Sequence, residues 1–204
     1  MAPSAPHFLE TIRIVDGQPQ LLSRHQTRVD RTRHRFFGKA PAFRLSRVID
    51  ELDLPASGVH KLRIVYGASL ESAEVHPYTI RPVRSLRVIE ADDLRYGKKY
   101  ADRSHLEKLF AQRAGCDDVL IVQRNHLTDS SYANLAFHDG NKWYTPAWPL
   151  LPGTRREELI DRGVLFPTVI RLRDLYQFEE VRLVNAMMEW EESPTIPTTA
   201  VLRH

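Results

Sequence analysis

The sequence has only one cysteine, Cys116, and it has no apolar run near the roughly 20 residues that a membrane-spanning helix needs. A single cysteine cannot form an internal disulfide, and its scarcity suits a reducing compartment. The first ten residues, MAPSAPHFLE, lack the basic region and apolar stretch of a secretory signal. We therefore expect a soluble, cytoplasmic protein.

The composition also shows no strong bias toward one kind of residue. Hydrophobic residues make up 42% and charged residues 27% of the 204 positions, and the formal net charge is +3. These values are ordinary for globular proteins and argue against disorder or a fibrous repeat. The length suits one large domain or two small ones.

A local excess of arginine stands out against this even composition. The run comprises Arg24, Arg28, Arg31, Arg33 and Arg35, with Arg44 and Arg47 just beyond it. A basic helix of this kind could bind nucleic acid. A solvated helix face is the favoured interpretation, because no recognised nucleic-acid motif and no interleaved aromatic residues accompany the run. Nucleic-acid binding stays a remote alternative.

The first part of the chain, residues 1–90, predicts a smaller α/β domain. Residues 8–15 alternate weakly and are followed by the turn signal Asp16-Gly17, so 20–22 is expected to be a return strand. A helix should begin with Ser23 as its N-cap and stop at Gly38. Residues 45–52 predict a second helix, and three further strands are expected over 61–66, 74–81 and 85–90.

The second part, residues 91–190, again mixes helices and strands. Helical spacing covers 104–114 and 155–162, and a further helix could span 175–180. Strands are expected over 118–123, 135–137, 142–144 and 181–185. Residues 191–204 have little periodicity and are expected to form a tail. The fold class is therefore α+β or α/β.

Four separated segments occur in a characteristic order: SRHQTRVDRT, YGKKYADR, LTDSSYANLAF and LLPGTRREELI. They resemble the motifs of the class IV aminotransferases, a family that binds pyridoxal 5'-phosphate (PLP) and includes aminodeoxychorismate lyase and the branched-chain and D-amino-acid aminotransferases. The matching positions are His25, Arg28, Lys99, Thr128, Asp129, Ser131, Asn134, Leu135, Phe137, Thr145, Pro146 and residues 152–155. The resemblance runs from about Phe8 to about Trp190. It implies a short member with the two-domain, D-amino-acid aminotransferase-like architecture (fold type IV) and the cofactor between the domains.

The resemblance assigns a cofactor role to several of these residues. Lys99, four residues before Arg103, would be the catalytic lysine that binds PLP covalently and carries protons, in preference to its neighbour Lys98. Asp129 stands where the family usually has a glutamate that pairs with the pyridine nitrogen, which keeps the ring an electron sink. Taken alone, an aspartate before a strand is more typical of a turn.

The cofactor's phosphate has two candidate anchors. Arg28 could bind it through charge-assisted hydrogen bonds, and the Gly153-Thr154 turn could present N–H groups at a helix start. Thr154 and Glu157 also fit a capping box, which needs no ligand. Asn185 could lie near the phosphate or the substrate, or could simply end a strand.

The expected activity is that of a PLP-dependent enzyme, either a lyase or an aminotransferase. The resemblance favours an aminodeoxychorismate lyase-like reaction, in which 4-amino-4-deoxychorismate gives 4-aminobenzoate and pyruvate. Transamination of a D-amino acid or a branched-chain amino acid is the alternative. Arg63, Tyr100 and Arg103 are candidates for substrate contacts. The resemblance also implies a homodimer acting on a small amino substrate, and no metal site or membrane contact is expected.

Overall fold

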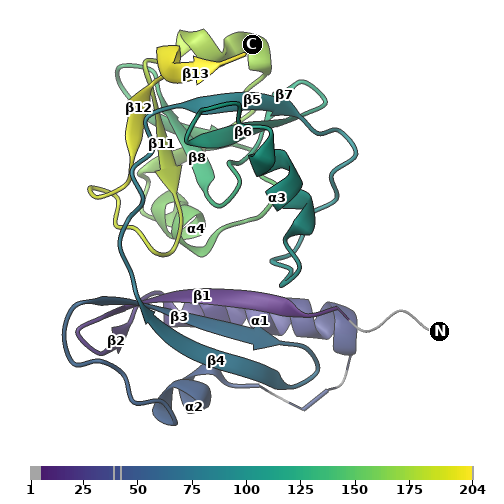
Figure 1. Cartoon of the computed structure of the whole chain (residues 1–204), viewed down its shortest axis with the longest axis vertical. Coiled ribbons are helices and arrows are strands. Elements are labelled where there is room, and N and C mark those ends of the chain that lie inside the picture. Colours follow the sequence, from purple (N-terminus) through teal and green to yellow (C-terminus); the bar gives the residue numbers. More distant parts are fainter. Residues whose placement is uncertain (1–5, 39, 42, 204) are drawn as a thin grey trace. The chain divides into compact units, whose positions relative to one another are not determined.

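The computed structural model describes residues 6–38, 40–41 and 43–203. The chain forms two compact units, drawn in Figure 1. Unit 1 comprises Met1–Thr79 and Lys98–Asp102, and unit 2 comprises Ile80–Gly97 and Arg103–His204. The division therefore comes at Thr79 instead of near residue 90, because strand 86–90 pairs with strands of unit 2 and a short segment around Lys99 returns to unit 1.

Unit 1 is a four-stranded antiparallel sheet with two helices. The strand order is β2-β1-β3-β4, formed by β1 (Phe8–Val15), β2 (Gln18–Pro19), β3 (Val59–Tyr66) and β4 (Leu70–Pro77). Helices α1 (Leu22–Phe37) and α2 (Leu45–Asp50) complete it. The core joins alternate residues of β1 and β3, such as Ile12 and Ile64, to Val29 of α1 and Leu45 of α2. This period of two shows that one face of the sheet is buried against the helices.

The start of α1 differs from the sequence-based prediction. The helix begins at Leu22 after Leu21, which has a left-handed backbone with φ 54°, so Ser23 is not the N-cap. The return strand is correspondingly earlier, at Gln18–Pro19. The predicted stop is confirmed, since Gly38 follows the helix with φ 56°, a conformation that glycine adopts at little cost.

Unit 2 contains two sheets. One has the order β10-β9-β8-β11-β12 and the other β13-β5-β6-β7. Their bounds are β5 (Leu86–Glu90), β6 (Asp118–Gln123), β7 (His126–Leu127), β8 (Asn134–His138), β9 (Trp143–Pro146), β10 (Leu165–Thr168), β11 (Glu180–Val184), β12 (Thr195–Pro197) and β13 (Val201–Leu202). Both sheets contribute to one apolar core, in which Leu120 of β6 and Phe137 of β8 are completely buried.

The helices of unit 2 are α3 (Ser104–Ala111), α4 (Thr154–Asp161) and the 3-10 helices η1 (Leu172–Gln177) and η2 (Thr198–Ala200). The helix predicted over 175–180 is thus an earlier 3-10 helix. The prediction of a tail over 191–204 is wrong, because β12 pairs with β11 and β13 pairs with β5. Ile196 and Val201 bury their side chains in the core.

Helices and strands mix in both units, as expected for an α+β or α/β protein. Among the residues that the structure describes, no helix combines the length and the apolar character needed to cross a membrane.

Candidate functional site

In unit 1, Glu10, His25 and Arg28 form a buried polar group beneath the sheet. Glu10 lies on β1 between Phe8 and Ile12, on the face that packs against α1. Arg28 donates from Nε to Oε1 at 2.8 Å and from Nη2 to Oε2 at 2.6 Å, a bidentate pair. His25 Nδ1 lies 2.5 Å from Oε2. The helical spacing of three residues puts His25 and Arg28 on one side of α1, where a single carboxylate contacts both.

The charges of this group are set by burial and by their mutual contacts. Burial alone would raise the pKa of Glu10, but the charge and hydrogen bonds of Arg28, together with His25, lower it to about 2. Burial lowers the pKa of His25 despite the neighbouring carboxylate. A neutral His25 therefore donates from Nδ1 to an ionised Glu10. Its Nε2 is buried and has no hydrogen-bond partner among the described residues.

Lys99 lies on the short segment that returns to unit 1. Leu9 donates its backbone N–H to the carbonyl of Lys99 at 2.8 Å, and Ala101 donates to His7 at 2.9 Å. This antiparallel pairing sets Phe8 opposite Tyr100. Tyr100 also donates its backbone N–H to the carbonyl of Lys98 at 3.0 Å, so the chain makes a tight turn at Lys99. The segment fixes the backbone of the predicted catalytic lysine against β1.

Two of the candidate substrate contacts also lie in unit 1, with different surroundings. The ring of Tyr100 packs against Phe8 at 5.2 Å between centroids and against Phe36 at 6.4 Å, so it belongs to an aromatic cluster. Arg63 is half-buried on β3 opposite Thr11, on the face away from the apolar core. Neither arrangement tests a substrate role, and both assignments stay predictions.

In unit 2, Asp129 is buried at the entrance to β8. Asn134 donates from Nδ2 to Oδ1 at 2.8 Å, and Leu151 donates its backbone N–H to Oδ2 at 2.9 Å. Burial raises the pKa of Asp129 to about 7, against the opposing effects of Asn134, Leu151 and the charge of Arg156. Asp129 is therefore more than an exposed turn residue. A buried carboxyl group that titrates near neutrality is typical of functional sites.

Thr154 lies at the start of α4, next to the same network. Gly153 is the N-cap of α4 and makes no side-chain cap, so the predicted capping box of Thr154 and Glu157 does not form. Thr154 is instead the first helical residue, and its Oγ1 is buried without a hydrogen-bond partner in the described part of the chain. An unpartnered hydroxyl at a helix N-terminus suits an anion, which the helix dipole and the orphan N–H groups also favour.

The other predicted residues of unit 2 have partners of their own. Arg103 donates from Nη2 to the carbonyl of Ser131 at 2.6 Å. The side-chain oxygen of Asn185 accepts the backbone N–H of Met187 at 2.8 Å, which stabilises the turn after β11. Arg103 therefore contacts the loop that carries Asp129. The bond of Asn185 is a structural one, and its predicted contact with phosphate or substrate stays a prediction.

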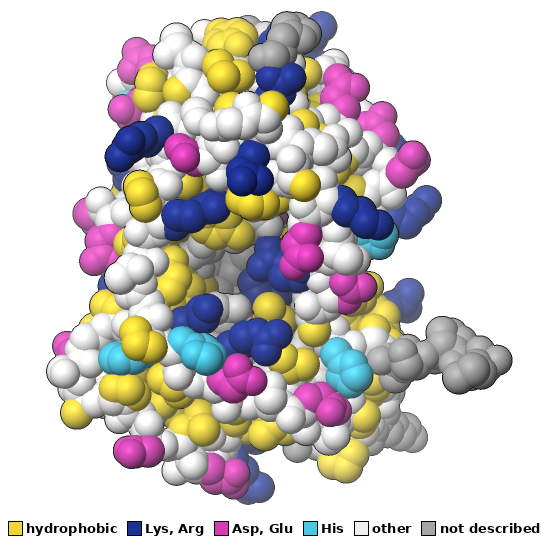
Figure 2. Space-filling view, viewed as in Figure 1, with side chains coloured by type: hydrophobic (Ala, Val, Ile, Leu, Met, Phe, Trp, Pro, Cys, Tyr) yellow, Lys and Arg dark blue, Asp and Glu magenta, His cyan; other side chains and the backbone are white. Residues whose placement is uncertain are grey.

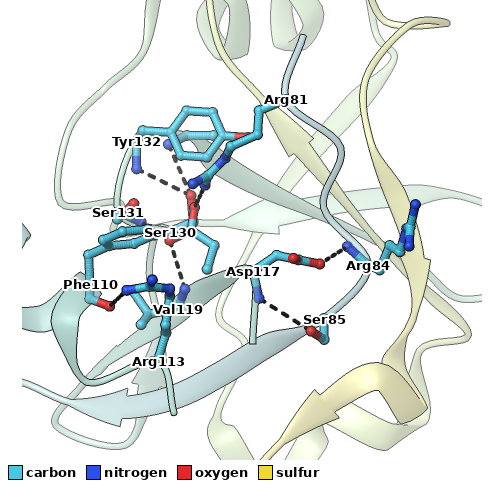
Figure 3. A network of polar contacts seen from close by, with 12 residues as sticks. Arg81, Arg84, Ser85, Phe110, Arg113, Asp117, Val119, Ser130, Ser131 and Tyr132 are labelled. Atoms are coloured by element: carbon cyan, nitrogen blue, oxygen red, sulfur yellow. Dashed lines mark hydrogen bonds and ion pairs between the residues drawn. The ribbon is translucent and has the colours of Figure 1, made fainter. Parts of the chain in front are cut away.

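Asp118 holds residues 130–132 of the loop that carries Asp129. Its carboxylate accepts hydrogen bonds from the backbone of Val119 and Ser131 and pairs with Arg81 at 3.2 Å. Figure 3 shows the guanidinium of Arg81 beside the ring of Tyr132, with a carbon-to-centroid distance of 5.1 Å. This network stabilises residues 130–132 and thereby the loop next to Asp129.

The arginine run on α1 does not form one solvated face. Arg28 pairs with Glu10, and Arg33 is buried and donates to the carbonyls of Gly67, Ala68 and Pro41. On the face seen in Figure 2, Lys and Arg side chains are interspersed with acidic and hydrophobic ones. Both observations argue against the nucleic-acid alternative, because Arg28 and Arg33 bind groups inside unit 1 and are not available to a nucleic acid.

Comparison with known proteins identifies the relatives of this chain. The model of the class IV amino-transferase family matches residues 7–191. The chain belongs to this family. An uncharacterized protein of Haemophilus influenzae is 36% identical over 183 residues, which cover 88% of this chain and 97% of that protein.

Solved structures of other proteins resemble this chain in fold. A "putative 4-amino-4-deoxychorismate lyase" from Haemophilus somnus 129PT is 32% identical, with a TM-score of 0.85, and covers 91% of this chain and 98% of its own. The PLP-bound form of a hypothetical aminotransferase from Mycobacterium tuberculosis is 17% identical, with a TM-score of 0.76 over 100% of this chain and 85% of its own, and shows a likeness of fold. The predicted fold class is confirmed.

The class IV aminotransferase family depends on PLP, and the residues described above fit that group. Unit 2 offers the unpartnered hydroxyl of Thr154 at a helix start and the buried carboxylate of Asp129. Lys99 and Arg28, to which the resemblance also assigns cofactor roles, lie in unit 1. Sequence reasoning missed Glu10, although an acid between the inward-facing Phe8 and Ile12 of an alternating strand is itself a signal for a buried carboxylate.

Proposed function

We propose that this protein is a PLP-dependent enzyme that converts 4-amino-4-deoxychorismate into 4-aminobenzoate and pyruvate. The observation that carries the cofactor assignment is the buried pairing of Asp129 with the motif residue Asn134. The Asn134 side chain lies against Gly153, the residue before Thr154, whose hydroxyl is unpartnered. The lyase assignment is supported by the description of the Haemophilus somnus relative at 32% identity.

The residues divide the chemistry among them. PLP, when bound, supplies an electron sink for the bond-breaking step. Lys99 would hold the cofactor covalently, then take and return protons at its Nζ. An ionised Asp129 would favour a protonated pyridine nitrogen, and the burial that raises the pKa of Asp129 would be offset by that positive charge.

Binding of the cofactor's phosphate would rest on charge and on amide groups. Thr154 and the first N–H groups of α4, at the Gly153-Thr154 turn, would donate hydrogen bonds. Arg28 would add a cationic contact, its orientation set by the bidentate pair with Glu10. Asn185, Arg63, Tyr100 and Arg103 stay proposed contacts for phosphate or substrate. We expect the protein to act in the cytoplasm as a homodimer.

A spectrum tests the cofactor assignment directly. Purified protein with added PLP should develop the visible absorption band of a lysine-bound cofactor. The variant Lys99→Ala should lose this band, and Lys98→Ala should keep it and serves as the matched control. Absence of the band in the wild-type protein would refute the PLP assignment, whereas its loss only in Lys98→Ala would move the assignment by one residue.

Product analysis separates the lyase from the second candidate, an aminotransferase. Lyase activity releases 4-aminobenzoate and pyruvate from 4-amino-4-deoxychorismate without an acceptor. An aminotransferase instead requires a 2-oxo acid and converts a D-amino acid or branched-chain amino acid into its 2-oxo acid. We expect 4-aminobenzoate, and turnover only in the presence of an amino-acid and 2-oxo-acid pair would favour the alternative.

A further inference from the structure

Asn134, the first residue of β8, links two elements through one side chain. Its Nδ2 donates to Asp129 Oδ1 at 2.8 Å and to the carbonyl of Leu151 at 2.8 Å. Leu151 in turn donates its N–H to Asp129 Oδ2 at 2.9 Å. Asn134 is 5% exposed, so water cannot readily replace these bonds. Both hydrogens of the amide are used, and the side chain is fixed in orientation.

The oxygen of the same amide faces Gly153. A Cβ built on Gly153 would lie 2.1 Å from Asn134 Oδ1, far inside van der Waals contact. The backbone of Gly153 has φ −78° and ψ 142°, which any residue can adopt. Glycine is therefore required here by space and not by backbone conformation. Because two hydrogen bonds hold the amide, its oxygen cannot swing aside without releasing Asp129.

We propose that Asn134 is a positioning residue that fixes Asp129 and the Gly153-Thr154 turn relative to each other. This inference rests on the proposed function, in which Asp129 meets the ring nitrogen and the turn meets the phosphate. The ring and phosphate of PLP are joined by a short linkage of one methylene group and one oxygen, which limits the distance between them, so the two protein groups must be held at a matching separation. The Asn134 amide provides that separation, because its Nδ2 binds Asp129 and its Oδ1 lies against Gly153.

Two variants of Asn134 test this role with equilibrium binding to the apoprotein. Asn134→Ala removes the amide, while Asn134→Asp keeps its volume and removes the donors to Asp129 and Leu151. Both should weaken PLP binding by about tenfold or more, the usual effect of losing a charge-assisted hydrogen bond. Pyridoxal, which lacks the phosphate, should lose less affinity because it engages only one of the two positioned groups.

A double-mutant cycle separates positioning from general destabilisation. Gly153→Ala alone should weaken PLP binding, since its methyl group displaces the Asn134 amide. In Asn134→Ala/Gly153→Ala the methyl group enters the space left by the amide, so binding should match Asn134→Ala within about twofold. Gly97→Ala is the matched control, because a Cβ there meets nothing within 4 Å. Its affinity should equal that of the wild-type protein.

The outcomes distinguish this inference from the proposed function. Additive losses in the double variant, or wild-type affinity in both Asn134 variants, would overturn the positioning role. If the wild-type protein binds no PLP, the proposed function fails, and the same cycle is then measured in the thermal unfolding of the apoprotein. There, non-additive melting temperatures support the contact of Asn134 with Gly153, and additive ones overturn it.

Discussion

At the scale of single residues, Asp129 is buried, whereas its local sequence is typical of an exposed turn. Burial raises the pKa of its carboxyl group from the ordinary value of 3.8 to about 7 in the folded apoprotein. The free energy of unfolding that this group contributes is greatest below pH 3.8 and is lost as the pH rises through about 7.

This linkage predicts the behaviour of Asp129→Asn. Relative to the wild-type apoprotein, the melting temperature of the variant should rise between pH 4.5 and pH 8, since the variant has no carboxyl group to ionise. Thermal unfolding across this range measures the difference. A difference independent of pH would show that Asp129 does not titrate there. In the loaded enzyme, the variant should keep the lysine adduct but lose most activity.

Glu10 shows the opposite linkage. Its pKa is lowered from 4.5 to about 2, so its contribution to stability is present above pH 4.5 and is lost as the pH falls through about 2. Glu10→Gln removes the negative charge that is paired with Arg28 inside unit 1. It should cost about 3 kcal/mol in the free energy of unfolding at pH 7, measured with urea.

An exposed ion pair provides the control for Glu10. Glu74 Oε2 lies 3.2 Å from His76 Nε2, and both side chains are about half exposed. Glu74→Gln should change the unfolding midpoint little, because exposed pairs contribute little to stability. Equal effects of the two substitutions would contradict the assignment of Glu10 as a buried charge partner.

At the scale of elements, α4 is a helix whose first residue carries an unused hydroxyl. Thr154→Val keeps the shape of the side chain and removes an Oγ1 that has no partner. The apoprotein should therefore melt at the wild-type temperature or above it. PLP affinity should fall about tenfold relative to pyridoxal, since the phosphate loses one donor.

Thr145 is the matched control for this prediction. It is equally buried, but its Oγ1 donates to the carbonyl of Leu135 at 2.9 Å and accepts from Arg156 Nε at 3.1 Å. Thr145→Val should lower the melting temperature because both bonds are lost. If Thr154→Val destabilises the apoprotein as strongly, its hydroxyl has a structural role and the phosphate assignment loses its support.

At the scale of the whole molecule, the basic pI of 9.1 does not predict a nucleic-acid partner. Arg28 and Arg33 are bound within unit 1, and the net charge is only +3. We expect no shift of labelled double-stranded DNA or RNA at micromolar protein in 150 mM salt. Binding that weakens steeply with added salt would revive the alternative, because such dependence marks phosphate contacts.

Much of the fold and the family could be predicted from the sequence. The strand Asp118–Gln123 has the predicted bounds, and most helices lie within a few residues of their predicted positions. These elements can be predicted because their signals, namely apolar periodicity and a glycine at the end of a helix, lie within a short stretch of sequence. The ordered motifs around Lys99, Asp129 and Thr154 indicated the family for the same reason, since each is contained in a short segment.

Only the tertiary structure decided which distant groups meet. The strands β12 and β13 are three and two residues long, too short for a periodic pattern, and they exist because β11 and β5 offer pairing edges. The bonds from Arg28 to Glu10 and from Asn134 to Leu151 join residues 18 and 17 positions apart. Hydrogen bonds and steric limits depend on distance in space, so the spacing of residues along the chain could name the candidates but could not pair them.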